Sequence, residues 1–216
     1  MGFWEAILLG VVQGLTEFLP VSSSGHLALF TAILGNDQLP AENLLFTILV
    51  HAATAIATMI VFRKDIVAIL SGIFKKDQSE TRAFVSYVVV SMIPAVVIGL
   101  FFEDQITALF DTNLALVGAM LCLTAVLLFF TDKASSKKQP ITYKIALLIG
   151  IAQAIAILPG ISRSGATIAV ALLIGVSRPE AARFSFLMVI PLILGSMAKS
   201  ILDLSLIHIS EPTRRP

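Results

Sequence analysis

Hydrophobic residues along this chain gather into eight segments, each bounded by short polar or turn-forming stretches. Those segments are 3–19, 24–34, 44–62, 83–102, 113–131, 142–158, 165–176 and 182–202. A helix needs about 20 predominantly apolar residues to cross the hydrocarbon core of a bilayer. Four segments have that length and predict membrane-spanning helices: 44–62, 83–102, 113–131 and 182–202. The pattern therefore predicts an all-α, polytopic helical membrane protein.

Two of the eight segments are too short to span a bilayer. Residues 24–34 and 165–176 run for 11 and 12 residues, and each follows a longer apolar segment across a break that contains Pro, with Gly as well in the second break. Broken, paired segments of this kind are tolerated at membrane depth where their backbone is buried in protein or faces water. We therefore expect two re-entrant helical hairpins.

The charged residues of the predicted loops are divided by sign between alternate loops. Three loops carry Arg63, Lys64, Lys75, Lys76 and Arg82, then Lys133, Lys137, Lys138 and Lys144, then Arg178 and Arg183. The loops between them carry only acidic charges: Asp37 and Glu42, then Glu103, Asp104 and Asp111. The positive-inside rule places the basic loops in the cytoplasm. The first hairpin then enters from outside and the second from the cytoplasm, so that their tips approach each other from opposite faces.

An internal repeat supports this arrangement. A shift of 140 residues superimposes five identical residues without a gap: Gly10 on Gly150, Gln13 on Gln153, Ser22 on Ser162, Ser24 on Ser164 and Gly25 on Gly165. Together with the opposite loop charges, the repeat predicts inverted-topology halves with a site at their interface.

The repeat also suggests how the chain is organised. We expect one integral membrane domain at 1–203, made of a first repeat, 1–131, and an incomplete second repeat, 142–203, without counterparts of the spans 83–102 and 113–131. Residues 204–216 resemble neither a cap nor a span, and we interpret them as a translated sequencing adaptor. His208 and Glu211 are excluded from the candidate site for that reason.

Composition agrees with a membrane protein. The chain is 57% hydrophobic and 13% charged, whereas soluble domains carry about 25% charged residues. The net charge of +1 does not indicate nucleic acid or an acidic partner. Cys122 is the only cysteine, which excludes a disulfide framework and a thiolate metal site.

The first polar island, Glu17 to His26, is the stretch in which chemistry is expected. Gln13 and Glu17 are four residues apart and share a helix face. Placing a carboxylate at membrane depth costs free energy, so the presence of Glu17 there predicts a functional role. Ser22, Ser23, Ser24 and Gly25 then open a new helix, where hydroxyls and free N–H groups either cap the helix or bind an anion. His26 is either a structural group or a base close to Ser23. His51 is a weaker candidate that lines a cavity or bonds to a neighbouring helix.

The second polar island, Pro159 to Thr167, contains an arginine in a hydrophobic context. Arg163 lies between Ser162 and Ser164, and its planar guanidinium matches phosphate oxygens. Gly165 permits close backbone approach, and Thr167 and Gln153 are polar positions that complete a cradle. Arg163 either forms a structural bridge to Glu17 or holds a ligand, and the two readings are compatible.

Two motifs carry a resemblance to a known family. The stretches Q-G-L-T-E-F-L-P-V-S-S-S-G-H (13–26) and L-P-G-I-S-R-S-G-A-T (158–167) resemble the two motifs of the undecaprenyl-pyrophosphate phosphatases of the bacitracin-resistance type. The resemblance covers residues 1–203. It implies an enzyme of the bacterial cytoplasmic membrane, with its site open to the outer face, that removes the terminal phosphate of a C55 isoprenoid pyrophosphate and so recycles the carrier lipid for peptidoglycan. It also implies a divalent cation, Mg²⁺ or Ca²⁺, for which Glu17 is the candidate ligand, although family members often have Glu at the place of Gln13.

These observations lead to one mechanistic hypothesis and one alternative. Ser23 attacks the terminal phosphorus after activation by Glu17 or His26, while Arg163 and the hydroxyls of the second island neutralise phosphate charge. The partners expected are the lipid substrate and the bilayer, with a homodimer left open and no nucleic acid. The alternative is a polyprenyl-phosphate flippase or secondary transporter, because broken helices at the midplane are typical of transporters. A transporter needs a binding site but no poised nucleophile, so phosphate release separates the two.

Overall fold

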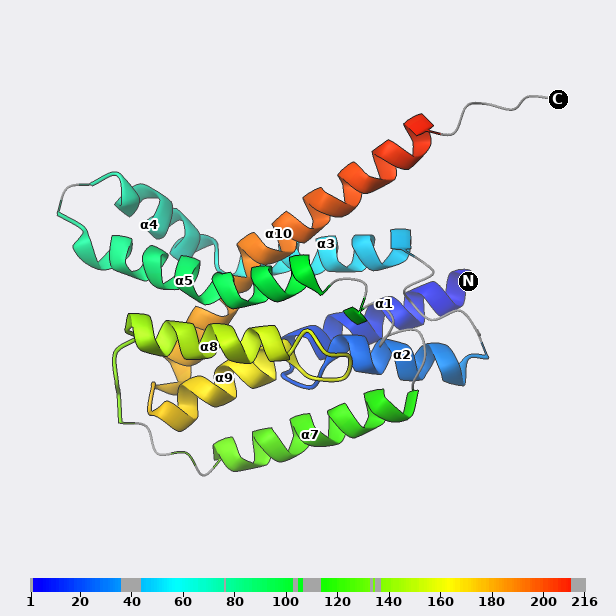
Figure 1. Ribbon diagram of the computed structural model, residues 1–216, viewed down its shortest axis with the longest axis horizontal. Helices are drawn as coiled ribbons and strands as arrows, with labels where there is room; N and C mark the ends of the chain where they lie inside the picture. The colour runs from blue at the N-terminus through cyan, green and yellow to red at the C-terminus, as the bar shows by residue number, and fades with distance from the viewer. Residues whose placement is uncertain are drawn as a thin grey trace.

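A computed structural model gives the fold of most of the chain. The described residues are 2–35, 44–75, 77–102, 105–106, 114–132, 134 and 137–210. Over these residues the chain forms helices and no β-strand, as Figure 1 shows. The helices are α1 (Phe3–Phe18), α2 (Ser23–Ile33), α3 (Leu44–Val61), α4 (Arg63–Ile73), α5 (Ser79–Phe101), α7 (Leu114–Asp132), α8 (Tyr143–Ile155), α9 (Arg163–Ile174) and α10 (Arg178–Ser210). The predicted all-α fold is confirmed.

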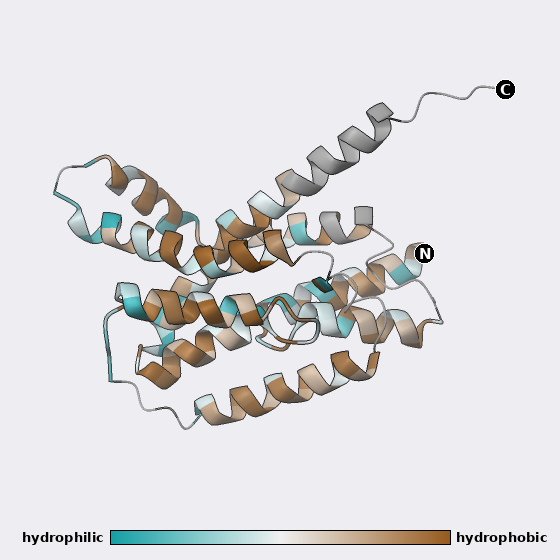
Figure 2. Ribbon diagram, viewed as in Figure 1, coloured by the Kyte–Doolittle hydropathy of each residue, from teal (hydrophilic) through white to brown (hydrophobic). Residues whose placement is uncertain are grey.

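Several helices are long and apolar enough to cross a bilayer. In the described part of the chain these are α5, α7 and the first part of α10, Arg178–Ala198. α3 occupies the fourth predicted span; it has 18 residues, or about 27 Å at the usual helical rise. Figure 2 shows that α5 and α7 are hydrophobic over most of their length, and many of their large hydrophobic side chains are exposed. Such a surface is stable where lipid covers it, and the chain is a multi-pass membrane protein.

The two re-entrant hairpins are α1–α2 and α8–α9. α2 has 11 residues and α9 has 12, so they are about 17 and 18 Å long, well short of the roughly 30 Å hydrocarbon core. In Figure 1 the hairpins come from opposite sides of the molecule, and their connecting loops meet near its middle. This is the arrangement that the short segments and the repeat predicted.

The basic stretch after residue 62 contains a helix that we did not predict. α4 forms over Arg63–Ile73, where a loop was expected. Its first turn contains Asp65, which accepts a hydrogen bond of 2.6 Å from Nε of Arg183, and that guanidinium lies 4.9 Å from the centroid of the Phe84 ring. A helix of this length is marginal in isolation. The contact with α10 and α5 stabilises it, and the local sequence does not reveal that contact.

α10 is longer at both ends than the predicted segment of 182–202. It begins at Arg178, because Pro179 in its first turn lacks only an N–H that would have no intrahelical partner there. Arg178 and Arg183 therefore belong to a helix and not to a loop. Residues 204–210, which we expected to lie outside any regular element, continue α10 to Ser210.

Some of the predictions fall on parts of the chain that the structure does not describe. These are residues 211–216 with Glu211, and the loop charges Asp37, Glu42, Lys76, Glu103, Asp104, Asp111 and Lys133. The adaptor origin of residues 204–216 stays a prediction.

The largest hydrophobic core lies between α5, α8, α9 and α10 and supports the second hairpin. Ile149 of α8 and Phe184 and Met188 of α10 are almost completely buried in it. α8 approaches α5 closely at Gly150, where a Cβ atom would lie 2.4 Å from the carbonyl oxygen of Ser91. A packed interior of this kind deforms little, so it fixes the position of the α8–α9 turn and of the residues that the turn carries.

Candidate active site

The second helix of each hairpin, α2 in the first and α9 in the second, begins with the same serine cap. The hydroxyl of Ser22 accepts a hydrogen bond from the N–H of Gly25 at 3.4 Å, and the hydroxyl of Ser162 accepts one from the N–H of Gly165 at 3.0 Å. In each hairpin the capping hydroxyl also lies 3.4 Å from the hydroxyl of the serine two residues further on. The two tips therefore have matching local structures at the 140-residue offset.

Glycines allow the two hairpin tips to interlock. A Cβ atom on Gly25 would lie 3.1 Å from Cα of Gly160, and one on Gly165 would lie 2.8 Å from the carbonyl oxygen of Pro20. Pro20 and Gly160 occupy equivalent positions of the two repeats, as do Gly25 and Gly165. The two contacts are therefore related by the pseudo-twofold symmetry, as expected of inverted repeats that meet at their tips.

Thr124 of α7 fixes the second tip. Its hydroxyl donates a hydrogen bond to the carbonyl oxygen of Gly160 at 3.2 Å and accepts one from the N–H of Ser162 at 3.1 Å. Gly160 has φ of 91°, a conformation that favours glycine. The side chain of Thr124 is buried, so it satisfies two backbone groups that could not reach water. The turn that carries Arg163 is thereby held in one conformation.

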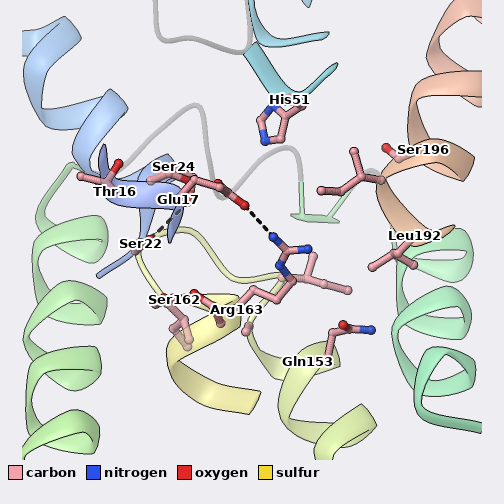
Figure 3. Close-up of a pocket in the computed structure, with 16 residues that line it drawn as sticks. Thr16, Glu17, Ser22, Ser24, His51, Gln153, Ser162, Arg163, Leu192 and Ser196 are labelled. Atoms are coloured by element: carbon pink, nitrogen blue, oxygen red, sulfur yellow. Dashed lines mark hydrogen bonds and ion pairs between the residues drawn. The ribbon is translucent and has the colours of Figure 1, made fainter. Parts of the chain in front are cut away.

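The centre of the site is the carboxylate of Glu17, at the end of α1. Its Oε1 accepts a hydrogen bond of 2.6 Å from Nη2 of Arg163, and its Oε2 accepts one of 2.5 Å from the hydroxyl of Ser23. Nε2 of Gln13 donates a third, of 3.1 Å, to Oε2. Figure 3 shows the carboxylate and the guanidinium extending toward each other from opposite hairpins. The predicted meeting of Glu17 and Arg163 is confirmed.

The residues that hold Glu17 are themselves related by the repeat. Ser23 is the first residue of α2 and Arg163 is the first residue of α9, and the two positions are equivalent in the repeats. The Glu17 carboxylate therefore binds the first residue of α2 and the first residue of α9. The side chains of Arg163 and Glu17 keep 24% and 10% of their exposure, so the ion pair is mostly withdrawn from water but open on one side. A ligand can reach it from that side.

A cavity of about 260 Å³ opens over this ion pair. It lies between the two hairpins, α3 and α10 (Figure 3). It is lined by Thr16, Glu17, Ser22, Ser23, Ser24, His51, Gln153, Ala156, Ile157, Ile161, Ser162, Arg163, Ser164, Leu192, Ile193 and Ser196. Hydroxyls from both repeats and the guanidinium share this space, and the rest of the wall is largely apolar. The cavity thus combines groups that can hold an anion with groups that can hold an alkyl chain.

Five predicted site residues lie next to the cavity without lining it. Gln13 is buried behind Glu17 and holds it in place. Nδ1 of His26 lies 2.8 Å from the carbonyl oxygen of Ser22, within its own helix. The hydroxyl of Thr167 is buried and lies 2.7 Å from that of Ser185 on α10. The structure gives Gly25 and Gly165 packing roles at the interlocked tips.

The cavity also contains residues that sequence reasoning ranked low or missed. His51 projects from α3 toward the Glu17 carboxylate, which agrees with the interpretation of it as a cavity residue (Figure 3). Leu192, Ile193 and Ser196 reach the cavity from α10 and were not singled out. A serine on an apolar span is common, and no local signal distinguishes one that faces a cavity.

The described residues offer a divalent cation only some of the ligands that it needs. Among the described residues there is no cluster of three or more His, Cys, Asp or Glu side chains. Of the described residues that line the cavity, Glu17 is the one carboxylate. Mg²⁺ is usually held by one or two carboxylates together with substrate phosphates. The site therefore fits a cation that a phosphate ligand brings with it and shares with Glu17, and does not form an all-protein metal cage.

The arrangement has the parts that phosphoryl transfer requires. A serine hydroxyl donates to a carboxylate that can take its proton. A guanidinium and several further hydroxyls surround the same space and can stabilise charge on phosphate oxygens. The apolar part of the wall excludes water from one side of that space.

Comparison with known proteins agrees with this geometry. Residues 6–213 match the family model described as bacitracin resistance protein BacA. An undecaprenyl-diphosphatase of Christiangramia forsetii is 54% identical over 203 residues, which cover 94% of this chain and 77% of that protein. Proteins of the same name from Bacteroides fragilis strain ATCC 25285 and Methanococcus vannielii are 50% and 46% identical, over 90% and 89% of this chain and 73% and 76% of theirs. The chain therefore belongs to the bacitracin resistance protein BacA family.

Proposed function

We propose that this protein is a membrane phosphatase that hydrolyses undecaprenyl diphosphate to undecaprenyl phosphate and inorganic phosphate. The family and the names of its similar relatives support this activity. The observation that carries the proposal is the placement of the Ser23 hydroxyl and the Arg163 guanidinium on the two oxygens of one buried carboxylate. Such hydrolysis returns the carrier lipid to cell-wall synthesis and confers resistance to bacitracin.

In the first chemical step Ser23 is the nucleophile. Its Oγ forms a bond to the terminal phosphorus while its proton passes to Oε2 of Glu17, and the bond between that phosphorus and the bridging oxygen breaks. The lipid phosphate leaves with the electron pair of the broken bond and takes the proton from Glu17. The hydrogen bond of 2.5 Å already aligns the hydroxyl with its proton acceptor.

In the second step water hydrolyses the phosphoserine. Glu17, again a carboxylate, accepts a proton from the attacking water, the bond between phosphorus and Oγ breaks, and the serine oxygen takes that proton back. Inorganic phosphate leaves and the site returns to its starting state. His26 remains the alternative base; its contact with the Ser22 carbonyl makes Glu17 the stronger candidate.

Arg163 neutralises the phosphate charge. In the structure its guanidinium is paired with Glu17, and a diphosphate that enters the cavity competes for the same donors. A guanidinium can bind two oxygens at once, so it can hold a phosphate while it stays close to the carboxylate. Hydroxyls of Ser162 and Ser164 line the same wall and supply further donors.

A divalent cation, Mg²⁺ or Ca²⁺, would be held by Glu17 together with the substrate. When bound, it would neutralise phosphate charge and polarise the terminal phosphorus. The residues of the chain would still supply the nucleophile and the proton acceptor.

The membrane sets how the substrate reaches the site. Leu192 and Ile193 of α10 and Ile157 beside α8 give the cavity an apolar wall that suits the first isoprene units of the lipid. We place the protein in the bacterial cytoplasmic membrane with the cavity open to the outer face, on the charge pattern of the loops. A homodimer stays a prediction, as does chain-length selectivity.

The test is release of inorganic phosphate from undecaprenyl diphosphate by the purified protein in detergent. We expect turnover by the wild type and its loss in Glu17→Ala. The inverted repeats favour a second candidate, a flippase for polyprenyl phosphates. Lipid transport in proteoliposomes without phosphate release would support that candidate and overturn the phosphatase.

A further inference from the structure

Gln153 is a buried polar side chain of the cavity wall that the proposed mechanism does not use. Gln153, in the last turn of α8, is only 1% exposed. Within the described part of the protein, neither its Nε2 nor its Oε1 has a hydrogen-bond partner. Leaving a buried amide unsatisfied is unfavourable, and buried polar groups are paired in the great majority of cases. Gln153 also lines the cavity, so a ligand can supply its partner.

The repeat explains why this amide is free. Gln13, the equivalent of Gln153, donates to Glu17 four residues later. The residue four positions after Gln153 is Ile157, which offers no acceptor. Gln13 therefore orients the catalytic carboxylate, whereas the equivalent residue of the second repeat, Gln153, faces the cavity.

The position of Gln153 indicates which part of a substrate it meets. In Figure 3 Ser22 and Ser24 of the first tip lie on one side of the Glu17–Arg163 pair, and Gln153 and Leu192 lie on the other. Ala156 and Ile157, which follow Gln153 at the end of α8, continue the cavity wall as apolar surface. Gln153 thus stands where the polar part of the cavity gives way to the apolar part.

We propose that Gln153 binds the phosphate that stays on the lipid and so selects a diphosphate over a single terminal phosphate. This inference rests on the proposed function. A substrate with its terminal phosphorus at Ser23 and its alkyl chain against the apolar wall places its second phosphate between these two groups. Nε2 of Gln153 then donates to an oxygen of that phosphate, and Oε1 accepts from a water molecule that the phosphate orders. Arg163, between the two sites, is shared by both phosphates.

The test is Gln153→Met, which keeps the length of the side chain and removes the amide. We expect kcat/KM for undecaprenyl diphosphate to fall about tenfold, mainly through a higher KM, because a hydrogen bond to a charged acceptor is lost. Inhibition by undecaprenyl phosphate should weaken by a similar factor, whereas inhibition by inorganic phosphate should stay within twofold of the wild type. The thermal unfolding midpoint should not fall, since no hydrogen bond within the protein is removed.

Gln13→Met is the matched control. Its amide holds Glu17, so the loss should fall on kcat, with little change in inhibition by the lipid monophosphate. Equal weakening of both inhibitors in Gln153→Met would overturn the proposal, and so would a lower unfolding midpoint with unchanged KM, because that result assigns the amide to the fold. If the wild type in the same preparation releases no phosphate, the proposed function fails instead, and the two failures are thereby distinguished.

Discussion

Ser23 and Arg163 stand 140 residues apart at equivalent positions of the two repeats and bind opposite oxygens of the Glu17 carboxylate. The inverted repeat thus delivers two different side chains to one place, a hydroxyl from one half and a guanidinium from the other. In the proposed mechanism the hydroxyl supplies the nucleophile and the guanidinium stabilises charge on the phosphate. The pseudo-twofold symmetry of the fold brings the two positions together, and the sequence difference between the halves gives them different side chains.

Replacing Arg163 separates its charge from its geometry. Arg163→Ala should lower kcat by about 10²–10³-fold, as loss of a preorganised donor to phosphate oxygens does. Arg163→Lys keeps the positive charge but cannot bind two oxygens in one plane, so it should recover only part of that loss. Steady-state phosphate release measures both. Full activity in Arg163→Lys would show that the charge alone suffices.

The ion pair between Glu17 and Arg163 should affect the thermal unfolding midpoint of the protein. Glu17→Gln leaves a mostly buried guanidinium without its counter-charge, and breaking a buried pair from one side is strongly destabilising. The double variant Glu17→Gln/Arg163→Met removes both charges and should unfold at a higher temperature than Glu17→Gln alone. The single variant Arg163→Met completes the cycle, and thermal unfolding in detergent of the wild type and the three variants gives four midpoints. If the two single losses simply add in the double variant, the pair is not coupled.

Thr124 is expected to act as a positioning residue for the second tip. Thr124→Val keeps the shape of the side chain and leaves the carbonyl of Gly160 and the N–H of Ser162 unpaired, at a cost of about 1–3 kcal/mol for each buried group. We expect a lower unfolding midpoint and a lower kcat with a smaller change in KM, because Arg163 loses its fixed orientation. Thr58→Val is a control, since among the described residues the hydroxyl of Thr58 bonds within its own helix, to the carbonyl of Thr54. Equal effects of the two substitutions would contradict the role of Thr124.

The interlocked tips should tolerate no added methyl group. Gly165→Ala would place its Cβ 2.8 Å from the carbonyl oxygen of Pro20, which is rigid backbone, and should destabilise the protein by about 1–3 kcal/mol. Gly14→Ala is the control, because a Cβ there would have no described atom within 4 Å beyond its chain neighbours and the nearby backbone of its own helix. In that helix Ala should stabilise by about 0.5–1 kcal/mol relative to Gly. Unfolding midpoints that rise for both variants would contradict the close approach of the hairpins.

Much of the architecture could be predicted because it depends on local patterns in the sequence. The short apolar segments, the Pro and Gly breaks and the 140-residue offset are properties of the sequence, and the meeting of Glu17 and Arg163 follows from them. α4 could not be predicted in this way, since an amphipathic basic segment becomes a helix only when Asp65 meets Arg183 across the fold. Which face of α3 or α10 borders the cavity depends on how the spans pack, so His51 ranked low and Ser196 was missed. In α8 the unpaired amide of Gln153 is likewise visible only after assembly.

The central claim is that Ser23, activated by Glu17, attacks the terminal phosphorus, and a pair of serine variants tests it most directly. Ser24 is adjacent, lines the same cavity and pairs with the Ser22 hydroxyl, whereas Ser23 donates to Glu17. Phosphate release from undecaprenyl diphosphate should fall by at least about 10³-fold in Ser23→Ala, since covalent catalysis is lost, and by less than about tenfold in Ser24→Ala, since a single hydrogen bond is lost. Activity in Ser23→Ala equal to that of Ser24→Ala would contradict the mechanism.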